Sequence, residues 1–212
     1  MKLNVFKLRS VALASLLLGG CANLPPAFVP AWTAERFTGQ VVEQDTGRPM
    51  PGAIVVGLWM ESRSDYVHSR FICVRVESAT TDANGSYRFP KWRNQYPQVF
   101  VYRPGFKFAE RYYSPERPRT VLQPFSGTTK ERLDELRRLT GRTWCDSAAE
   151  TGTKENLLSL WQAMYDEAKN IAQIPRDQEE VDFFLTRVEE LTLGWETAEK
   201  RQLERGKIRR GQ

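Results

Sequence analysis

The sequence predicts an α+β fold, in which a β-sandwich or barrel is followed by a helical extension. Residues 37–125 contain short extended segments separated by Gly, Pro, Asn and Asp. Regular short strands with frequent turns are typical of sandwiches and barrels. In residues 126–212 apolar side chains recur at helical spacing instead. The chain has 212 residues, which is enough to bury a substantial core.

Residues 1–20 have the features of a cleaved export signal. Three cations, Lys2, Lys7 and Arg9, precede a short apolar core that runs from Val11 to Leu18. The core is too short to span a bilayer. The next residues, Leu18-Gly19-Gly20-Cys21, resemble the lipobox of bacterial lipoproteins. This resemblance implies cleavage before Cys21 and acylation of that cysteine, whereas the alternative is an ordinary signal followed by an incidental cysteine.

The resemblance to lipoproteins also implies a location. Several acyl chains hold a protein on a membrane far more firmly than one chain does. Ala22 follows Cys21, and lipoproteins without Asp at that position resemble those sorted to the outer membrane. We therefore expect a protein anchored in the outer membrane that faces the periplasm or the cell surface. Residues 21–36 contain Pro25, Pro26 and Pro30 and predict a semi-rigid tether.

The β-region is predicted to begin with a strand over Phe37 to Glu43, in which residues that face a core alternate with residues that do not. The uninterrupted apolar run from Ala53 to Met60 indicates a central strand covered on both faces. We expect Glu61 to Ser69 to be a polar connection and Asp82 to Gly85 to be a hairpin turn. Further strands are predicted in Phe71 to Thr80, Tyr87 to Phe89, Gln98 to Tyr102, Lys107 to Tyr113 and Val121-Leu122.

Four short motifs carry a more specific resemblance. They are Gly39-x-Val41, Thr46-Gly47-x-Pro49, Pro51-Gly52-Ala53-x-Val55 and Thr81-Asp82-x-x-Gly85-x-Tyr87-x-Phe89. In order and spacing they resemble the carboxypeptidase regulatory-like domain over about Phe37 to Pro124. This resemblance implies a seven-stranded antiparallel Greek-key β-sandwich of the transthyretin-like kind, which serves as a binding or scaffolding module rather than as a catalyst. Glu61 to Arg75 is longer than the usual link and predicts a projecting loop or hairpin.

Residues 126–212 are predicted to form a helical extension. Thr128 to Glu131 make a capping box for a helix that we expect Gly141 to stop. Two later apolar stripes predict an antiparallel helical hairpin: Leu157, Leu160, Trp161, Met164, Tyr165, Ala168, Ile171 and Ala172, then Val181, Phe184, Leu185, Val188, Leu191, Trp195 and Ala198. We expect the helices to cover a second face of the sandwich, formed by Ile54, Val56, Leu58 and Met60. Arg201 to Gln212 is expected to be a frayed basic end.

The cysteines give a further prediction. Once Cys21 is acylated, Cys73 and Cys145 remain, and an even pair in an oxidising compartment favours a disulfide. Two buried free thiols are the alternative. His68 is the single histidine of the chain and lies in the polar connection. With nothing to mark this histidine as an orienting base, a catalytic cysteine is not expected.

The sequence predicts no enzyme activity, no cofactor and no metal site. It contains no nucleophile-elbow, zinc-protease, phosphate-loop or dinucleotide motif. Asp82-Ala-Asn84-Gly85 lacks the distal glutamate of a calcium loop. Removal of the three leader cations lowers the formal net charge from +5 to +2, which is too small to favour nucleic acid as a partner.

One aromatic and basic region is a candidate ligand-binding surface. Its members are Trp92, Arg93, Tyr102, Arg103, Lys107, Arg111 and Tyr112. Interleaved cations and rings suit stacking on sugars or contact with anionic groups, whereas an ordinary sheet with aromatic residues inward and arginines outward would give the same pattern. We therefore expect a lipid-anchored interaction or scaffold module with an envelope protein partner. The alternative is a protein that uses this surface to bind an envelope glycan, either peptidoglycan or lipopolysaccharide.

Overall fold

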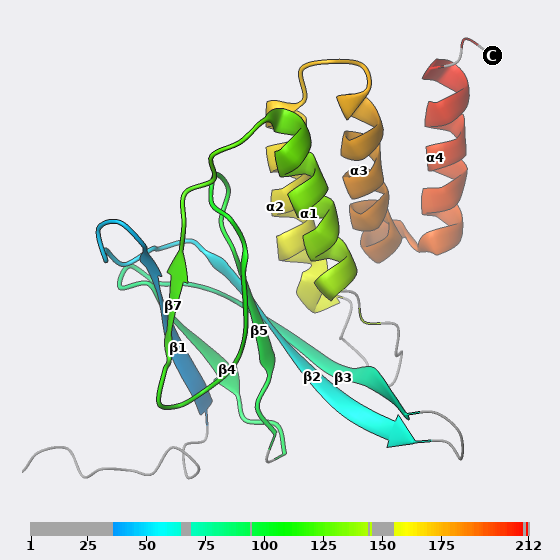
Figure 1. Ribbon diagram of the computed structural model, residues 1–212. Coiled ribbons are helices and arrows are strands. Elements are labelled where there is room, and N and C mark those ends of the chain that lie inside the picture. Colours follow the sequence, from blue (N-terminus) through cyan, green and yellow to red (C-terminus); the bar gives the residue numbers. More distant parts are fainter. Residues whose placement is uncertain are drawn as a thin grey trace, which may run out of the picture. The chain divides into compact units, whose positions relative to one another are not determined.

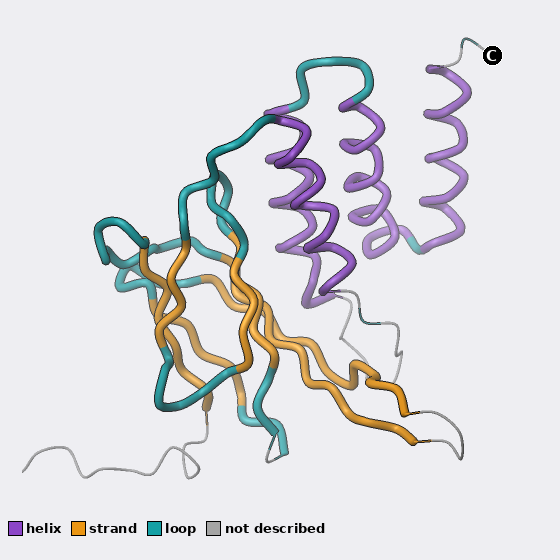
Figure 2. The backbone as a smooth tube through the Cα atoms, in the orientation of Figure 1, coloured by secondary structure: helices purple, strands orange, loops and turns teal. Residues whose placement is uncertain are grey.

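The computed structural model describes residues 36–64, 69–93, 95–143, 145, 155–209 and 211. The export signal, Cys21, the tether up to residue 35 and His68 therefore lie outside the described residues. Within the described part, seven strands precede four α-helices, so the predicted α+β class is confirmed (Figure 1). Figure 2 shows the same division of the chain into a strand region followed by a helical region.

The strands form two sheets. Their bounds are β1 (Arg36–Glu43), β2 (Ile54–Ser64), β3 (Ser69–Thr80), β4 (Ser86–Pro90), β5 (Gln98–Tyr102), β6 (Ala109–Tyr112) and β7 (Arg119–Leu122). One sheet has the order β4-β1-β7 and the other has the order β3-β2-β5-β6. All named pairings are antiparallel except that of β1 with β7, which is parallel. The prediction of an antiparallel arrangement is therefore wrong for this pair. The chain passes through the other sheet before β7 returns to β1, and parallel pairing needs a long connection of this kind.

Glu61 to Ser69 was predicted to be a polar connection, but the structure shows that β2 and β3, the two longest strands, extend into it. The antiparallel register of β2 and β3 continues from Ile54 opposite Thr80 as far as Ser64 opposite Ser69. The described residues of this segment, 61–64 and 69, are therefore strand, and the expected projecting hairpin is confirmed (Figure 1). Polar side chains do not end a strand when the ladder satisfies the backbone groups and the side chains face water.

The predicted turn at Asp82 is present, but it is not a hairpin. The Asp82 carboxylate accepts hydrogen bonds from the backbone N–H groups of Asn84 and Ser86, both at 2.9 Å. Gly85 has φ +69°, and a Cβ there would lie 2.4 Å from the carbonyl oxygen of Val41. β3 and β4, which this turn joins, belong to different sheets. The turn therefore carries the chain from one sheet to the other.

The inner faces of the two sheets share an apolar core that is rich in rings. The three-stranded sheet contributes Phe37, Val41, Tyr87, Phe89 and Leu122, and the four-stranded sheet contributes Val55, Trp59, Val74, Val99 and Val101. Trp59 is fully buried, and its ring centroid lies 6.3 Å from that of Phe37 and 6.1 Å from that of Phe89. Such tilted and edge contacts are favourable between aromatic rings. Gly39 belongs to this packing, because a Cβ there would lie 2.4 Å from the Tyr87 ring.

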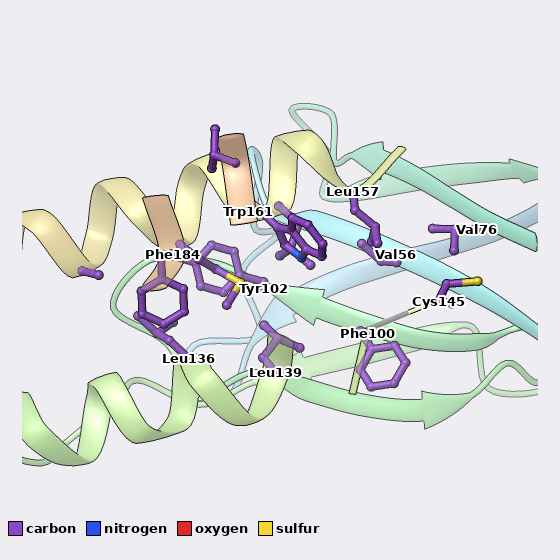
Figure 3. Close-up of a cluster of buried hydrophobic side chains, with 14 of the residues drawn as sticks. Val56, Val76, Phe100, Tyr102, Leu136, Leu139, Cys145, Leu157, Trp161 and Phe184 are labelled. Carbon is purple, nitrogen blue, oxygen red and sulfur yellow. The ribbon is translucent and has the colours of Figure 1, made fainter. Parts of the chain in front are cut away.

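The helices cover the opposite face of the four-stranded sheet and form a second core with it. They are α1 (Thr129–Thr143), the 3-10 turn η2 (Glu155–Leu157), α2 (Leu158–Ile171), α3 (Asp177–Leu193) and α4 (Trp195–Arg209). Val56 and Leu58 of β2 are buried in this core, with Ile54 and Met60 packed at its border. Figure 3 shows Val56 and Phe100 beside the helical residues Leu139, Leu157 and Trp161. The prediction that the helices cover this face is confirmed. Both faces of β2 are buried, which explains why the residues from Ala53 to Met60 are apolar without interruption.

The beginning of α1 follows the predicted capping box. The Thr128 backbone N–H donates to the Glu131 carboxylate at 2.7 Å, and the Glu131 N–H donates to the Thr128 hydroxyl oxygen at 3.3 Å. The hydrogen bonds from the Thr128 backbone and hydroxyl hold the pKa of Glu131 below its ordinary value. The end of α1 was predicted wrongly, because the helix continues through Gly141 to Thr143. A glycine in an exposed helical position costs only about 1 kcal/mol, and Leu139 is fully buried beside it.

The C-terminal helices also depart from the prediction of a hairpin. The second predicted stripe is divided at Gly194, which has φ +86° and ends α3. A separate helix, α4, then runs from Trp195 to Arg209. The prediction that the basic segment from Arg201 onward is frayed is therefore wrong for the residues up to Arg209. The physical reason is that its arginines bond to carboxylates of α3, as described below.

Candidate functional site

The predicted disulfide is present and ties the helical part to the sheet. Cys73 lies on β3 and Cys145 lies just after α1, with Cα atoms 5.3 Å apart. Both residues are buried in the second core. A bridge across 72 residues of sequence restricts the unfolded chain and stabilises the fold by about 4 kcal/mol on the chain-entropy account. Cys21, the predicted site of acylation, lies outside the described residues.

The candidate ligand-binding residues are not all brought to one surface. Trp92 is 8% exposed and belongs to the core between the sheets, whereas Tyr102 is 1% exposed and belongs to the core under the helices. These two rings therefore lie on opposite sides of the four-stranded sheet. Tyr112, at 73% exposure, is the one ring of the candidate set that faces solvent.

The cations of the candidate set are partly committed to contacts within the protein. The Arg93 guanidinium lies 4.3 Å from the centroid of the Trp92 ring and pairs with Glu61. Lys107 donates from Nζ to Oε1 of Gln123 at 3.4 Å. Arg111 donates to the carbonyl oxygens of Arg117 and Arg119 and so fastens β6 to the segment that leads into β7. Arg103 is half-buried on the connection between β5 and β6.

A buried charged cluster on the helical side was not predicted from the sequence. Arg132 of α1 is 3% exposed and forms a two-pronged ion pair with Glu167 of α2, with N–O distances of 2.9 and 2.8 Å. The same guanidinium reaches Glu135, one turn further along α1, at 2.9 Å. Glu167 follows Met164 at helical spacing, on the predicted apolar face of α2. A carboxylate in that position was the signal in the sequence that could have revealed the cluster.

This cluster, which we call the Arg132 cluster, also binds the connection between β5 and β6. The Tyr102 hydroxyl donates to Glu167 at 2.6 Å, and the Gly105 N–H donates to the same carboxylate at 3.0 Å. The Phe108 N–H donates to Glu135 at 3.1 Å, and Arg132 donates to the Phe106 carbonyl oxygen at 2.6 Å. Buried charges are tolerated when they are paired and hydrogen-bonded in this way.

The environment sets the protonation states of Tyr102 and Arg132. Burial raises the pKa of Tyr102 well above its ordinary value, and the negative charge of Glu167 raises it further. Burial alone would lower the pKa of Arg132, but the carboxylates of Glu167 and Glu135 outweigh this effect and raise it. Tyr102 is therefore a neutral donor and Arg132 is a cation. Tyr102 and Arg132 both donate hydrogen bonds to Glu167, so the cluster holds α1, α2 and the β5–β6 connection together.

A second charged cluster joins α3 and α4. Arg205 lies 2.9 Å from Glu189 and donates to the Thr186 hydroxyl oxygen at 3.0 Å. Arg209 pairs with Asp182, and Arg201 lies 3.5 Å from Glu189. The arginines of this α3–α4 cluster remain partly exposed. Among the described residues of α4, Ala198 alone is buried, so apolar packing contributes little to this helix. The ion pairs of the α3–α4 cluster explain why it is nevertheless ordered as a helix.

A cavity of about 610 Å³ lies where α2, α3 and α4 meet, next to the disulfide. Leu157, Trp161, Leu191 and Trp195 line it, together with Cys145. Arg187 and Glu190 also line it, and they pair with each other at 2.7 Å. The lining is therefore mostly apolar, and its charged members partner each other.

Among the described residues, no three His, Cys, Asp or Glu side chains are placed to hold a metal ion together. No helix in that part of the chain is long and apolar enough to cross a membrane. Comparison of the chain with protein-family models, curated proteins and solved structures gave no significant match. A proposal about function therefore rests on the residues and their packing.

Proposed function

We propose that this protein is a lipid-anchored lipoprotein of the outer membrane that acts as a non-catalytic interaction or scaffold module. The Leu18-Gly19-Gly20-Cys21 motif supports the anchor, and the observation that carries the non-catalytic role is the Arg132 cluster. General acid–base catalysis needs a titratable group that can exchange a proton with a substrate. Arg132, Glu135 and Glu167 instead bond to one another and to the backbone. Their chemistry is used to hold helices on a sheet, which suits a rigid body that presents surfaces to partners.

We further propose that the β-region is a Greek-key sandwich of the carboxypeptidase regulatory-like kind. Support comes from the motif residues, because they have structural roles. The Thr81 hydroxyl donates to the Met50 carbonyl oxygen at 2.6 Å and accepts from the Ala53 N–H at 2.8 Å. Tyr87 and Phe89 are buried between the sheets.

The proposed anchor is tested by intact-mass spectrometry of the protein isolated from cell membranes. The expected product begins at Cys21 and carries the mass of several acyl chains. The matched control is the Cys21→Ser variant, which is expected to lack both the acyl mass and the cleavage before residue 21. An unmodified amino terminus at another position in the wild-type protein would contradict the proposal.

The proposed role as an interaction module is tested by cross-linking in intact cells. The acylated protein is expected to give discrete adducts with an envelope protein, and the Cys21→Ser variant is expected to give fewer of them because it is not held at the membrane. Wild-type protein that is membrane-bound but forms no adduct, with cross-linkers of several lengths, would remove the support for a scaffold role.

The glycan-binding hypothesis stays a prediction, and the structure changes the way to test it. Substitution of Trp92 or Tyr102 would disturb a core, whereas Tyr112 is 73% exposed. Tyr112→Ala is therefore the informative variant. If the protein binds envelope glycan through this ring, pull-down on purified peptidoglycan or lipopolysaccharide will be lost while the melting temperature stays nearly the same. Absence of binding by the wild-type chain would end the hypothesis.

A further inference from the structure

The three-stranded sheet has an outer face that is distinct from both cores. Residues in a strand alternate between its faces, and Phe37, Tyr87 and Leu122 point inward. The alternate positions of β1, β4 and β7 therefore form the outer face, which we call the arginine face. They are Arg36, Thr38, Gln40, Ser86, Arg88, Pro90, Arg119 and Val121, whereas Val42, the next position of this row on β1, is buried. The helices pack on the other sheet (Figure 1), so they do not cover this face.

Charge on the arginine face has one sign. Arg36, Arg88 and Arg119 are exposed, and none of them forms an ion pair with another residue that the structure describes. The strand positions of this face include no Asp or Glu. Val121 lies among the arginines and is 49% exposed.

The strand register brings the three arginines close together. Arg88 is opposite Thr38, and Arg119 is opposite Gln40. Arg36 precedes Thr38 by one strand repeat on the same face. From the spacing of strands and the rise per residue, the three backbone positions lie within roughly 15 Å of one another. This is about twice the Debye length at physiological ionic strength, about 8 Å, so the three guanidinium groups face the same anionic surface but each acts largely on its own headgroups.

We propose that the arginine face lies against the anionic phospholipid headgroups of the membrane, an inference that rests on the proposed lipid anchor. Anionic lipids attract clustered basic side chains, and a guanidinium binds phosphate oxygens in a two-pronged geometry. The half-exposed Val121 suits the boundary between headgroups and water. The net charge of the mature chain is only +2, so the attraction comes from this local arrangement and not from the protein as a whole.

The point at which the chain enters β1 supports this orientation. β1 begins at Arg36, on the arginine face, directly after the residues that connect it to Cys21. Residues 21–35 span at most about 50 Å when fully extended, so an acyl group in the membrane keeps the face within reach of the lipid surface. A tether of this length raises the effective concentration of the second contact to about the millimolar range. A weak electrostatic contact is then sufficient to orient the protein.

The test uses the mature chain from residue 21 onward with Cys21→Ser, so that no acyl group contributes. Binding is measured by co-sedimentation with vesicles of phosphatidylglycerol and phosphatidylcholine, and with vesicles of phosphatidylcholine alone. We expect binding to the anionic vesicles that weakens as salt is added. Each arginine contributes about a fivefold increase in partition, so the Arg36→Ser, Arg88→Ser, Arg119→Ser triple variant should bind about a hundredfold more weakly.

A matched control separates this face from general charge attraction. Lys169, Arg176 and Lys200 are exposed on the helical side, and replacing all three by Ser changes the net charge equally. This control variant should keep its partition within about threefold of the parent chain. Circular dichroism checks that each variant is folded. If the triple variant of the arginine face unfolds, Arg88→Ser alone should still weaken binding about fivefold.

Three results would overturn the proposal. The first is failure of the unacylated chain to bind phosphatidylglycerol vesicles at low ionic strength. The second is an equal loss of binding in the control variant. The third is binding of the arginine face to isolated glycan or to a protein partner without binding to vesicles. Because the tested chain carries no acyl group, these results are independent of the mass spectrometry that tests the anchor.

Discussion

The two charged clusters of the helical region use the same residue types in different surroundings. In the Arg132 cluster the paired side chains of Arg132, Glu135 and Glu167 are 4%, 8% and 7% exposed. In the α3–α4 cluster, Arg201 and Arg209 are 52% and 34% exposed. Buried pairs are costly to break, because the remaining charge cannot be solvated, whereas exposed pairs contribute little. We therefore expect α1 and α2 to be fixed firmly to the sheet and α4 to be held weakly.

The largest expected effect follows removal of the central cation. Arg132→Met keeps most of the side-chain volume and leaves the carboxylates of Glu135 and Glu167 buried without a cation. We expect it to lower the free energy of unfolding by about 3–5 kcal/mol, measured by urea unfolding with the disulfide intact. The matched control is Arg137→Met on the same helix. Arg137 is 54% exposed and pairs with Glu180, so its loss should cost at most about 1 kcal/mol. Equal effects for the two variants would contradict the comparison.

A smaller effect is expected from the hydroxyl of Tyr102. Tyr102→Phe keeps the ring but removes a donor to Glu167, at a cost of about 1–3 kcal/mol. The pKa of Tyr102 is raised in the folded state. Above pH 10 the unfolded chain therefore releases this proton more readily, and the wild-type protein should lose stability as the pH rises. Tyr102→Phe should lack this part of the alkaline loss. Tyr112→Phe, at an exposed position, is the control and should change neither quantity.

The α3–α4 cluster provides the next comparison. Arg205→Met removes contacts with the buried Glu189 and Thr186, but Arg205 is itself 22% exposed and Glu189 keeps Arg201 as a second cation. We expect a loss of about 1 kcal/mol in stability, together with faster hydrogen exchange in α4 and unchanged exchange in α1. A loss as large as that of Arg132→Met would show that both clusters are equally important to the fold.

The smallest expected effect concerns the start of α1. The pKa of Glu131 is lowered by its hydrogen bonds with Thr128, so its contribution is present above the ordinary value of 4.5 and is lost as the pH falls through the lowered pKa. Glu131→Gln should therefore be less stable than the wild type at neutral pH, and the difference should shrink on acidification. The measurement is thermal unfolding of both proteins across the acidic range, and a difference that stays constant with pH would contradict this cause.

Local patterns in the sequence predicted most of the strands and the packing of helices on the sheet. The apolar run from Ala53 to Met60 was informative because both faces of a central strand are buried. Turn residues located Asp82 to Gly85, yet they carried no information about which sheet follows, since the same turn geometry serves a hairpin or a crossing. The parallel pairing of β1 and β7 was missed because it depends on contacts between residues far apart in the chain.

The charged clusters show a different limit. Glu167 lies within an apolar stripe, but a single carboxylate there does not identify its partner, which is on another helix. The arginines after residue 200 resembled a solvated tail because their carboxylate partners precede them on α3. The aromatic and basic pattern from Trp92 to Tyr112 could not reveal that Trp92 and Tyr102 would lie on opposite sides of one sheet, because the intervening loop breaks the alternation.

Hydrogen–deuterium exchange of the intact protein tests the central structural claim most directly, namely that the Arg132 cluster and the disulfide unite helices and sheets in one cooperative body. The account predicts that the slowest amides of α1 and α2 exchange with the same free energy of opening as those of β2 and β5, while α4 opens at lower free energy. Exchange of α1 and α2 well before the β2 and β5 amides would contradict the claim.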